Sequence, residues 1–117
     1  MLVVEDDASL RELYRSVLTA AGYRVIAVED GVDALRQLET IHPGIIVLDL
    51  ALPRLSGRDV QQELASHAET RDIPILVVTG TETRDLDTTG FACVLDKPIR
   101  PHALVAAVAE CLQRYRR

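Results

Sequence analysis

The chain has 117 residues, of which 48% are hydrophobic and 26% are charged. This length and apolar content predict one folded domain spanning residues 1–117 and argue against disorder. The net charge of −5 gives no reason to expect that this domain binds nucleic acid directly. No apolar stretch is long enough to span a membrane and the N-terminus lacks a secretory signal, so we expect a cytoplasmic protein without a membrane partner.

Three predicted strands occupy the first half of the chain, at residues 2–4, 23–28 and 45–48. Between them, apolar residues at helical spacing predict two helices, one that starts at Ser9 and one around residues 32–38. Ser9 and Glu12 are predicted to form a capping box at the start of the first helix, and Gly22 is predicted to end it. Residues 45–48 are nearly all apolar, as expected for a parallel strand covered on both faces.

The second half continues the alternation, with strands predicted at residues 75–78 and 91–95. One helix is predicted after Gly57, and its apolar face carries Val60, Leu64, Ala65 and Ala68. Another helix is predicted to begin at Pro101. Residues 80–90 are polar and include two glycines, so the fourth helix of the pattern is predicted to be shortened or disordered. Alternating strands and helices predict an α/β fold, a parallel sheet with helices on both faces.

The cysteines and histidines show no ligand spacing. Cys93 and Cys111 lie far apart in apolar stretches, so we expect two buried thiols, with a disulfide or a metal site as the alternative. The histidines fall near predicted helix ends or turns and are expected at the surface: His42, His67 and His102.

Polar residues with chemical potential follow four of the predicted strands. Ligands of parallel sheets bind outside the carboxyl ends of the strands. Glu5 and Asp6 follow the first strand, Asp49 the third, Thr79 the fourth and Lys97 the fifth. Each residue alone has an ordinary explanation as a strand-end, capping or surface residue, and helix capping is the better explanation for the neighbouring Asp7. Their occurrence at four strand ends predicts a common site.

These residue types suit phosphoryl transfer. Three carboxylates in one pocket would repel one another without a cation, and their oxygens suit a hard divalent ion such as Mg²⁺ or Mn²⁺. Lys97 supplies a positive charge able to bind a phosphoryl group, and Thr79 supplies a hydroxyl donor. With Asp49 as a carboxylate nucleophile, the set contains the parts needed to form an aspartyl phosphate.

The chain resembles the receiver domain of two-component response regulators. The resemblance spans essentially the whole chain and rests on four segments: LVVEDD at 2–7, IIVLDLALPRLSG at 45–57, ILVVTG at 75–80 and VLDKPI at 94–99. It implies a flavodoxin-like sheet of five parallel strands in the order 2-1-3-4-5. It also implies that Asp49 is the phospho-acceptor, charged from a phosphohistidine on a histidine kinase or histidine phosphotransfer domain.

The resemblance assigns the remaining site residues. Asp6 would bind Mg²⁺ directly and Glu5 through water, while Ala51 would offer its backbone carbonyl to the metal. Thr79 would donate its hydroxyl to the phosphoryl group, and Lys97 would form an ion pair with it.

Three further positions bear on the resemblance. It implies a cis bond before Pro98. The family often has a tyrosine or phenylalanine three residues before the lysine, where this chain has Val94. The spacing from Thr79 to Lys97 is also shorter than expected, and the missing residues fall at the fourth helix. We therefore expect a receiver that does not signal through the usual aromatic switch and dimerisation face, as in a hybrid kinase or phosphorelay.

Two other functions are weighed against this one. A pseudo-receiver would bind its partners constitutively and would not need the complete set of site residues. An aspartyl-phosphate phosphatase of the haloacid dehalogenase type needs an acid two residues after the nucleophile, where this chain has Ala51. We expect a switch with self-phosphorylation and slow autodephosphorylation as its only chemistry. Its context is left open between a stand-alone receiver, a receiver fused to the output domain of a transcription factor and a receiver of a hybrid histidine kinase.

Overall fold

The protein is represented by a computed structural model that describes residues 1–52, 55–80 and 90–115. Within these ranges, five parallel strands form one sheet in the order β2-β1-β3-β4-β5, which confirms the predicted topology. The strands are β1 (Leu2–Val4), β2 (Ile26–Val28), β3 (Ile46–Asp49), β4 (Ile75–Thr79) and β5 (Cys93–Asp96).

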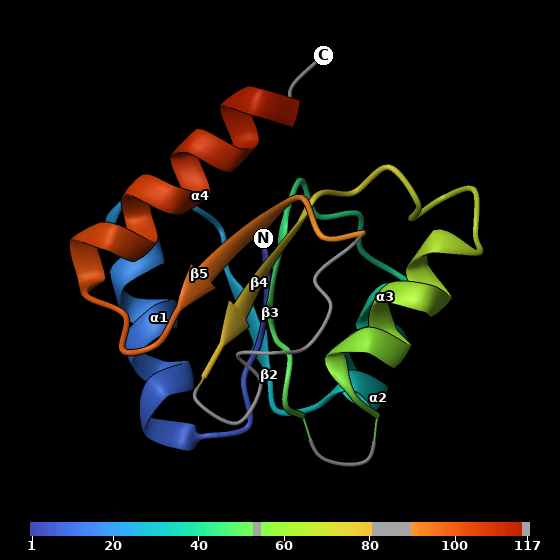
Figure 1. The fold of residues 1–117 in the computed structure, drawn as a ribbon, viewed down its shortest axis with the longest axis horizontal. Helices are drawn as coiled ribbons and strands as arrows, with labels where there is room; N and C mark the ends of the chain where they lie inside the picture. Colours follow the sequence, from blue (N-terminus) through green and yellow to red (C-terminus); the bar gives the residue numbers. More distant parts are fainter. Residues whose placement is uncertain (53–54, 81–89, 116–117) are drawn as a thin grey trace.

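Helices cover both faces of the sheet (Figure 1). The helices α1 (Ala8–Ala20) and α4 (Pro101–Tyr115) lie on one face, and α2 (Gly31–Gln37) and α3 (Gly57–Ala65) lie on the other. None of the helices in the described ranges is long and apolar enough to cross a membrane. The shortened or disordered fourth helix predicted within residues 80–90 falls almost entirely outside the described residues.

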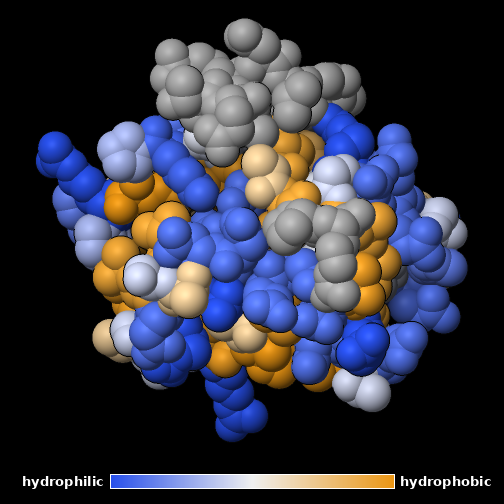
Figure 2. Space-filling model, turned by 90° about the horizontal axis from the view of Figure 1, so that it is seen from below, coloured by the Kyte–Doolittle hydropathy of each residue, from blue (hydrophilic) through white to orange (hydrophobic). Residues whose placement is uncertain are grey.

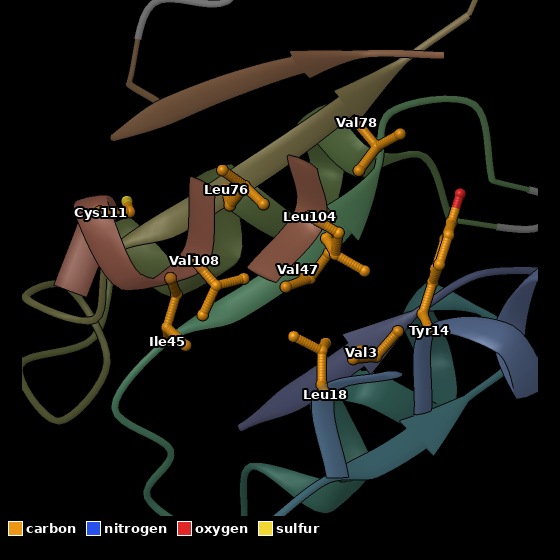
Figure 3. Close-up of a cluster of buried hydrophobic side chains, with 10 residues drawn as sticks. All are labelled: Val3, Tyr14, Leu18, Ile45, Val47, Leu76, Val78, Leu104, Val108 and Cys111. Carbon is orange, nitrogen blue, oxygen red and sulfur yellow. The ribbon is translucent and has the colours of Figure 1, made fainter. Parts of the chain in front are cut away.

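Two apolar clusters join these layers. Because β1, β3 and β4 are covered on both faces, both alternating sets of their side chains are buried, which explains their continuous apolar sequences. The cluster beneath α1 and α4 is drawn in Figure 3 and contains Val3, Tyr14, Leu18, Ile45, Val47, Leu76, Val78, Leu104, Val108 and Cys111. The cluster beneath α2 and α3 contains Leu2, Val4, Ala34, Ile46, Leu48, Val60, Leu64, Ile73 and Ile75.

The start of α1 differs from the predicted capping box. Asp7 is the N-cap, as expected for this residue, and its Oδ1 accepts a hydrogen bond of 2.9 Å from the backbone N–H of Leu10. Glu12 pairs with Arg15 along the helix instead of reaching back to Ser9. A carboxylate caps a helix as well as a hydroxyl does, so the helix begins before Ser9. Gly22 ends the helix as predicted.

Three of the four strands that carry the polar residues, β3, β4 and β5, end one residue later than predicted, whereas β1 ends at Val4 as predicted. Asp49 and Thr79 are thus the last residues of β3 and β4, and both are buried. At one sheet edge, β5 begins at Cys93, two residues later than predicted. At the other edge, β2 is shorter than predicted because only Ile26–Val28 pair with the three residues of β1.

The third helix is also shorter than its apolar pattern predicts. Val60 and Leu64 are buried, whereas Ala65 and Ala68 are exposed. The helix ends at Ala65, and the hydroxyl of Ser66 donates a 2.7 Å hydrogen bond to the carbonyl oxygen of Glu63. The helical repeat therefore stops before Ala68 can reach the sheet.

Cys93 and Cys111 form a disulfide, which corrects the expectation of two buried thiols. It joins β5 to α4, with the two Cα atoms 6.3 Å apart. Cys111 belongs to the apolar cluster beneath α1 and α4 and the partly buried Cys93 packs against it, so the pairing follows from the packing of α4 on β5. The three histidines are exposed, as predicted.

Candidate functional site

The strands of the sheet all end at one edge, which Figure 2 views directly. In Figure 2, hydrophilic residues gather in the middle of this face. The parallel register aligns the strand ends: Val4 pairs with Leu48, Asp49 with Val78, and Thr79 with Asp96. The polar residues that follow or end β1, β3, β4 and β5 are therefore neighbours, as the sequence predicts.

Three carboxylates meet at the ends of β1 and β3. Oxygen atoms of Glu5, Asp6 and Asp49 all lie within 4.8 Å of one another. Glu5 is 1% exposed and Asp49 is 5% exposed, whereas Asp6 faces solvent. The backbone N–H of Asp7 donates to Glu5 Oε2 at 3.2 Å and helps to hold that side chain. The site thus combines two buried acids with one at its mouth.

Lys97, the only lysine in the sequence, lies between the two buried acids. Its Nζ is 3.2 Å from Asp49 Oδ2, to which it donates, and 3.1 Å from Glu5 Oε1. Its backbone N–H donates to the carbonyl oxygen of Thr79 at 2.7 Å. The bond between Lys97 and Pro98 is cis, in agreement with the resemblance. The ammonium group therefore links the acids of two separate strands.

The charges of this site affect one another. Burial, followed by the negative charge of Asp49, raises the pKa of Glu5 to about 7. Burial alone would lower the pKa of Lys97, but the charges of Asp49 and Glu5 outweigh it and raise that pKa above its ordinary value. One ammonium group thus does not fully offset the combined effect of burial and of the Asp49 charge on Glu5.

The residues present fit a hard divalent cation. Glu5 Oε1 is buried and has no hydrogen-bond partner among the described residues, although Lys97 forms an ion pair with it. Together with the oxygens of Asp6 and Asp49, it forms an all-oxygen donor set of the kind that Mg²⁺ and Mn²⁺ prefer. A cation there would add a second positive charge beside this buried oxygen, whose contact with Lys97 is an ion pair.

The loop after Asp49 is held close to the start of α3. The backbone N–H of Ala51 donates to Asp49 Oδ1 at 3.1 Å, and the N–H of Gly57 donates to the carbonyl oxygen of Leu50, also at 3.1 Å. A Cβ atom on Gly57 would lie 2.8 Å from both the Asp49 carbonyl oxygen and Leu50 Cα. Only glycine therefore lets the helix approach the acceptor loop so closely.

Thr79 is buried at the end of β4, and its hydroxyl is engaged by a residue that the sequence analysis does not assign. Thr79 Oγ1 donates a 2.7 Å hydrogen bond to Asp96 Oδ1. Asp96 is the residue opposite Thr79 in the register of β4 and β5 and precedes Lys97. Aligning the two predicted strands by their polar ends would have placed the two residues together.

Arg11 is a second functional candidate that sequence reasoning misses. Its guanidinium donates to the backbone carbonyl oxygens of Glu5 at 3.0 Å and Asp6 at 3.4 Å. Arg11 thus holds the short turn that carries both acids. Its position one turn into a helix that begins beside these acids is the only sequence signal for this role.

Replacement of Lys97 by methionine is expected to destabilise the metal-free protein by about 1–3 kcal/mol. The change keeps a long apolar side chain but leaves the buried carboxylates of Glu5 and Asp49 without their cation. Chemical denaturation with and without MgCl₂ would measure the effect, and added Mg²⁺ should recover part of the loss. Arg100→Met, which removes a nearby exposed cation, is the control. Equal effects of the two substitutions would contradict the expected role of Lys97.

Comparison with known proteins places this site in a family. The family model described as the response regulator receiver domain matches residues 1–109. The chain belongs to the response regulator receiver domain family. The receiver fold is also found in the chemotaxis response regulator CheY4 of Vibrio cholerae, with a TM-score of 0.85 and 25% sequence identity over 94% of this chain and 95% of that one.

Curated relatives of this receiver domain are about twice as long. It is 36% identical to the "Response regulator MprA" of Mycobacterium ulcerans over 97% of this chain and 50% of the relative. It is also 36% identical to the "Probable transcriptional regulator ycf27" of Porphyridium aerugineum, over 97% of this chain and 48% of the relative. The chain thus spans about half the length of these relatives and is a receiver domain of two-component signalling.

Proposed function

We propose that Asp49 accepts a phosphoryl group from a phosphohistidine and that residues 1–117 act as a single phosphorylation-dependent switch domain. The position of the Asp49 carboxylate carries this proposal. This carboxylate ends a buried strand, and its Oδ2 is 3.2 Å from Lys97 Nζ. Carboxylate oxygens of Asp49, Glu5 and Asp6 all lie within 4.8 Å of one another. A nucleophile, a cation and a set of metal-binding oxygens thus occur together, which is what phosphoryl transfer to aspartate requires.

In the transfer step, a carboxylate oxygen of Asp49 forms a bond to phosphorus while the bond from phosphorus to the donor histidine nitrogen breaks. Glu5, Asp6, Asp49 and the backbone carbonyl of Ala51 would hold Mg²⁺ or Mn²⁺. The bound ion supplies positive charge that offsets the charge of the phosphoryl oxygens. Lys97 keeps its charge close to Asp49 and exchanges its contact with the carboxylate for one with the phosphoryl group.

Thr79 would stabilise the phosphorylated state by donating its hydroxyl to a phosphoryl oxygen. Its place at the end of β4, the strand that pairs with β3, supports this role because Asp49 ends β3. Thr79 therefore stands where a change at Asp49 can be passed to β4 and β5. Beyond self-phosphorylation and slow autodephosphorylation, no enzymatic activity is proposed.

The partner is a histidine kinase or a histidine phosphotransfer domain in the cytoplasm. The greater length of the curated relatives supports a fused output or kinase domain as the element that the switch controls. The complete set of acids, hydroxyl and ammonium favours this function over a pseudo-receiver. The apolar side chain of Ala51 disfavours a phosphatase of the haloacid dehalogenase type, because it supplies no general acid.

Incubation with acetyl phosphate and MgCl₂ tests the proposal. We expect one phosphoryl group to be added per chain, as measured by intact mass, which separates a phosphoryl adduct from acetylation of Lys97. Chelation of the metal with EDTA should suppress the adduct, because the carboxylates would again repel the incoming phosphoryl oxygens. Absence of a phosphoryl adduct in the presence of Mg²⁺ would refute the proposal.

A further inference from the structure

The hydrogen bond from Thr79 to Asp96 occupies the only proton that the threonine hydroxyl can donate. The bond is 2.7 Å long and joins the last residues of β4 and β5. A hydroxyl donates one hydrogen bond at a time, so Thr79 cannot bond Asp96 and a phosphoryl oxygen together. The acceptor is a carboxylate, and hydrogen bonds to charged groups are stronger than those between neutral groups. The unphosphorylated arrangement therefore has a specific competitor for the switch hydroxyl.

We infer that Asp96 is a positioning residue that holds Thr79 away from Asp49 until phosphorylation draws the hydroxyl across. This inference rests on the proposed phosphorylation of Asp49 and identifies what opposes the switch. When Thr79 bonds the phosphoryl group, the Thr79–Asp96 bond breaks and the carboxylate of Asp96 is released. The relative strength of these two bonds sets how readily the phosphorylated arrangement forms.

The surroundings of Asp96 allow its release to be sensed at the surface. Residues of β5 alternate in burial, and both Val94 and Asp96 lie on the more exposed set. Val94, two residues earlier on the same side of the strand, is 48% exposed. Release of Asp96 changes the position of a charge beside this apolar residue. The end of β5 can thus report the state of Thr79 without an aromatic side chain at position 94.

Binding of the beryllium trifluoride anion with Mg²⁺, followed by backbone amide spectra, tests the inference. This anion binds carboxylates as a stable phosphoryl mimic. Asp96→Ala is expected to tighten its binding by about tenfold or more, the gain that the net strength of one hydrogen bond to a charged group implies. Asp96→Asn, which keeps an oxygen acceptor at the same place, should show a smaller gain.

The double variants separate competition for Thr79 from general effects of charge. In a Thr79→Val background, Asp96→Ala should change the affinity by less than about twofold, since the bond that it removes is already absent. Asp72→Ala, which removes an exposed acid near the opposite end of β4, controls for net charge. Denaturation curves of each variant identify losses of stability, which a purely structural Thr79–Asp96 bond would produce without a gain in affinity.

Three outcomes would overturn the inference. They are no gain in Asp96→Ala, equal gains in Asp96→Ala and Asp96→Asn, and a gain that persists in the Thr79→Val background. Any of these with normal binding by the unaltered protein would leave the proposed function intact. Failure of the unaltered protein to bind the anion with Mg²⁺ would overturn the proposed function, and the inference with it.

Discussion

Asp49→Asn is expected to reduce phosphorylation by acetyl phosphate to background. An amide nitrogen and a neutral carbonyl oxygen cannot replace the carboxylate nucleophile, although the side chain keeps its shape. The substitution also removes one of the two acids that contact Lys97, so we expect the variant to fold, with Glu5 left as the partner of the ammonium group. Intact mass after incubation with acetyl phosphate and MgCl₂ measures the result.

Asp33→Asn is the matched control for this prediction. Asp33 belongs to a second group of three carboxylates, with Glu29 and Asp30, at the start of α2. This second group has no lysine beside it, because the only lysine of the chain is Lys97. Asp33→Asn should therefore leave labelling unchanged. A phosphoryl adduct that survives Asp49→Asn and disappears in Asp33→Asn would move the acceptor to the second group.

Reduction of the Cys93–Cys111 disulfide is expected to lower the free energy of unfolding by about 3 kcal/mol. The two residues are 18 positions apart. In the chain-entropy model, a disulfide that closes a loop of this length raises the free energy of the unfolded chain by about 3 kcal/mol, because it lowers the entropy of that chain. Urea denaturation with and without dithiothreitol measures the difference. Reduction should also change the amide chemical shifts along β5, because this strand loses its covalent link to α4.

Cys93→Ala provides the control, because it cannot form the disulfide and leaves the buried Cys111 in place. Its stability should be the same with and without dithiothreitol. An unaltered protein whose stability is also indifferent to the reductant would mean that the two thiols are not joined in solution.

The general plan of this receiver was predictable because its strands alternate regularly with helices. The apolar runs that became β3 and β4 are typical of buried parallel strands, and their parallel arrangement brings Asp49 and Thr79 to one edge. The contacts between Lys97 and the two buried acids, Glu5 and Asp49, then follow from topology. Residue type and position along the strands were sufficient for this part of the site.

Contacts that depend on side-chain direction or on the packing of distant elements were not predictable. The disulfide forms because α4 places Cys111 against β5. The spacing between the two cysteines in the sequence does not indicate this packing. The hydrogen bond from Thr79 to Asp96 depends on the threonine rotamer, on which the sequence is silent. The capping box predicted at Ser9 is wrong because Asp7, two positions earlier, is an equally good N-cap residue and begins α1.

The packing of α4 beside α1 has a consequence for how the protein is made. On this face, residues from the first and last described helices, among them Leu18 and Val108, complete one cluster over Val47 and Leu76. Until residues 101–115 leave the ribosome, this face of the sheet is therefore covered by α1 alone. Such a nascent chain exposes apolar surface and is vulnerable to aggregation until α4 emerges and closes the core.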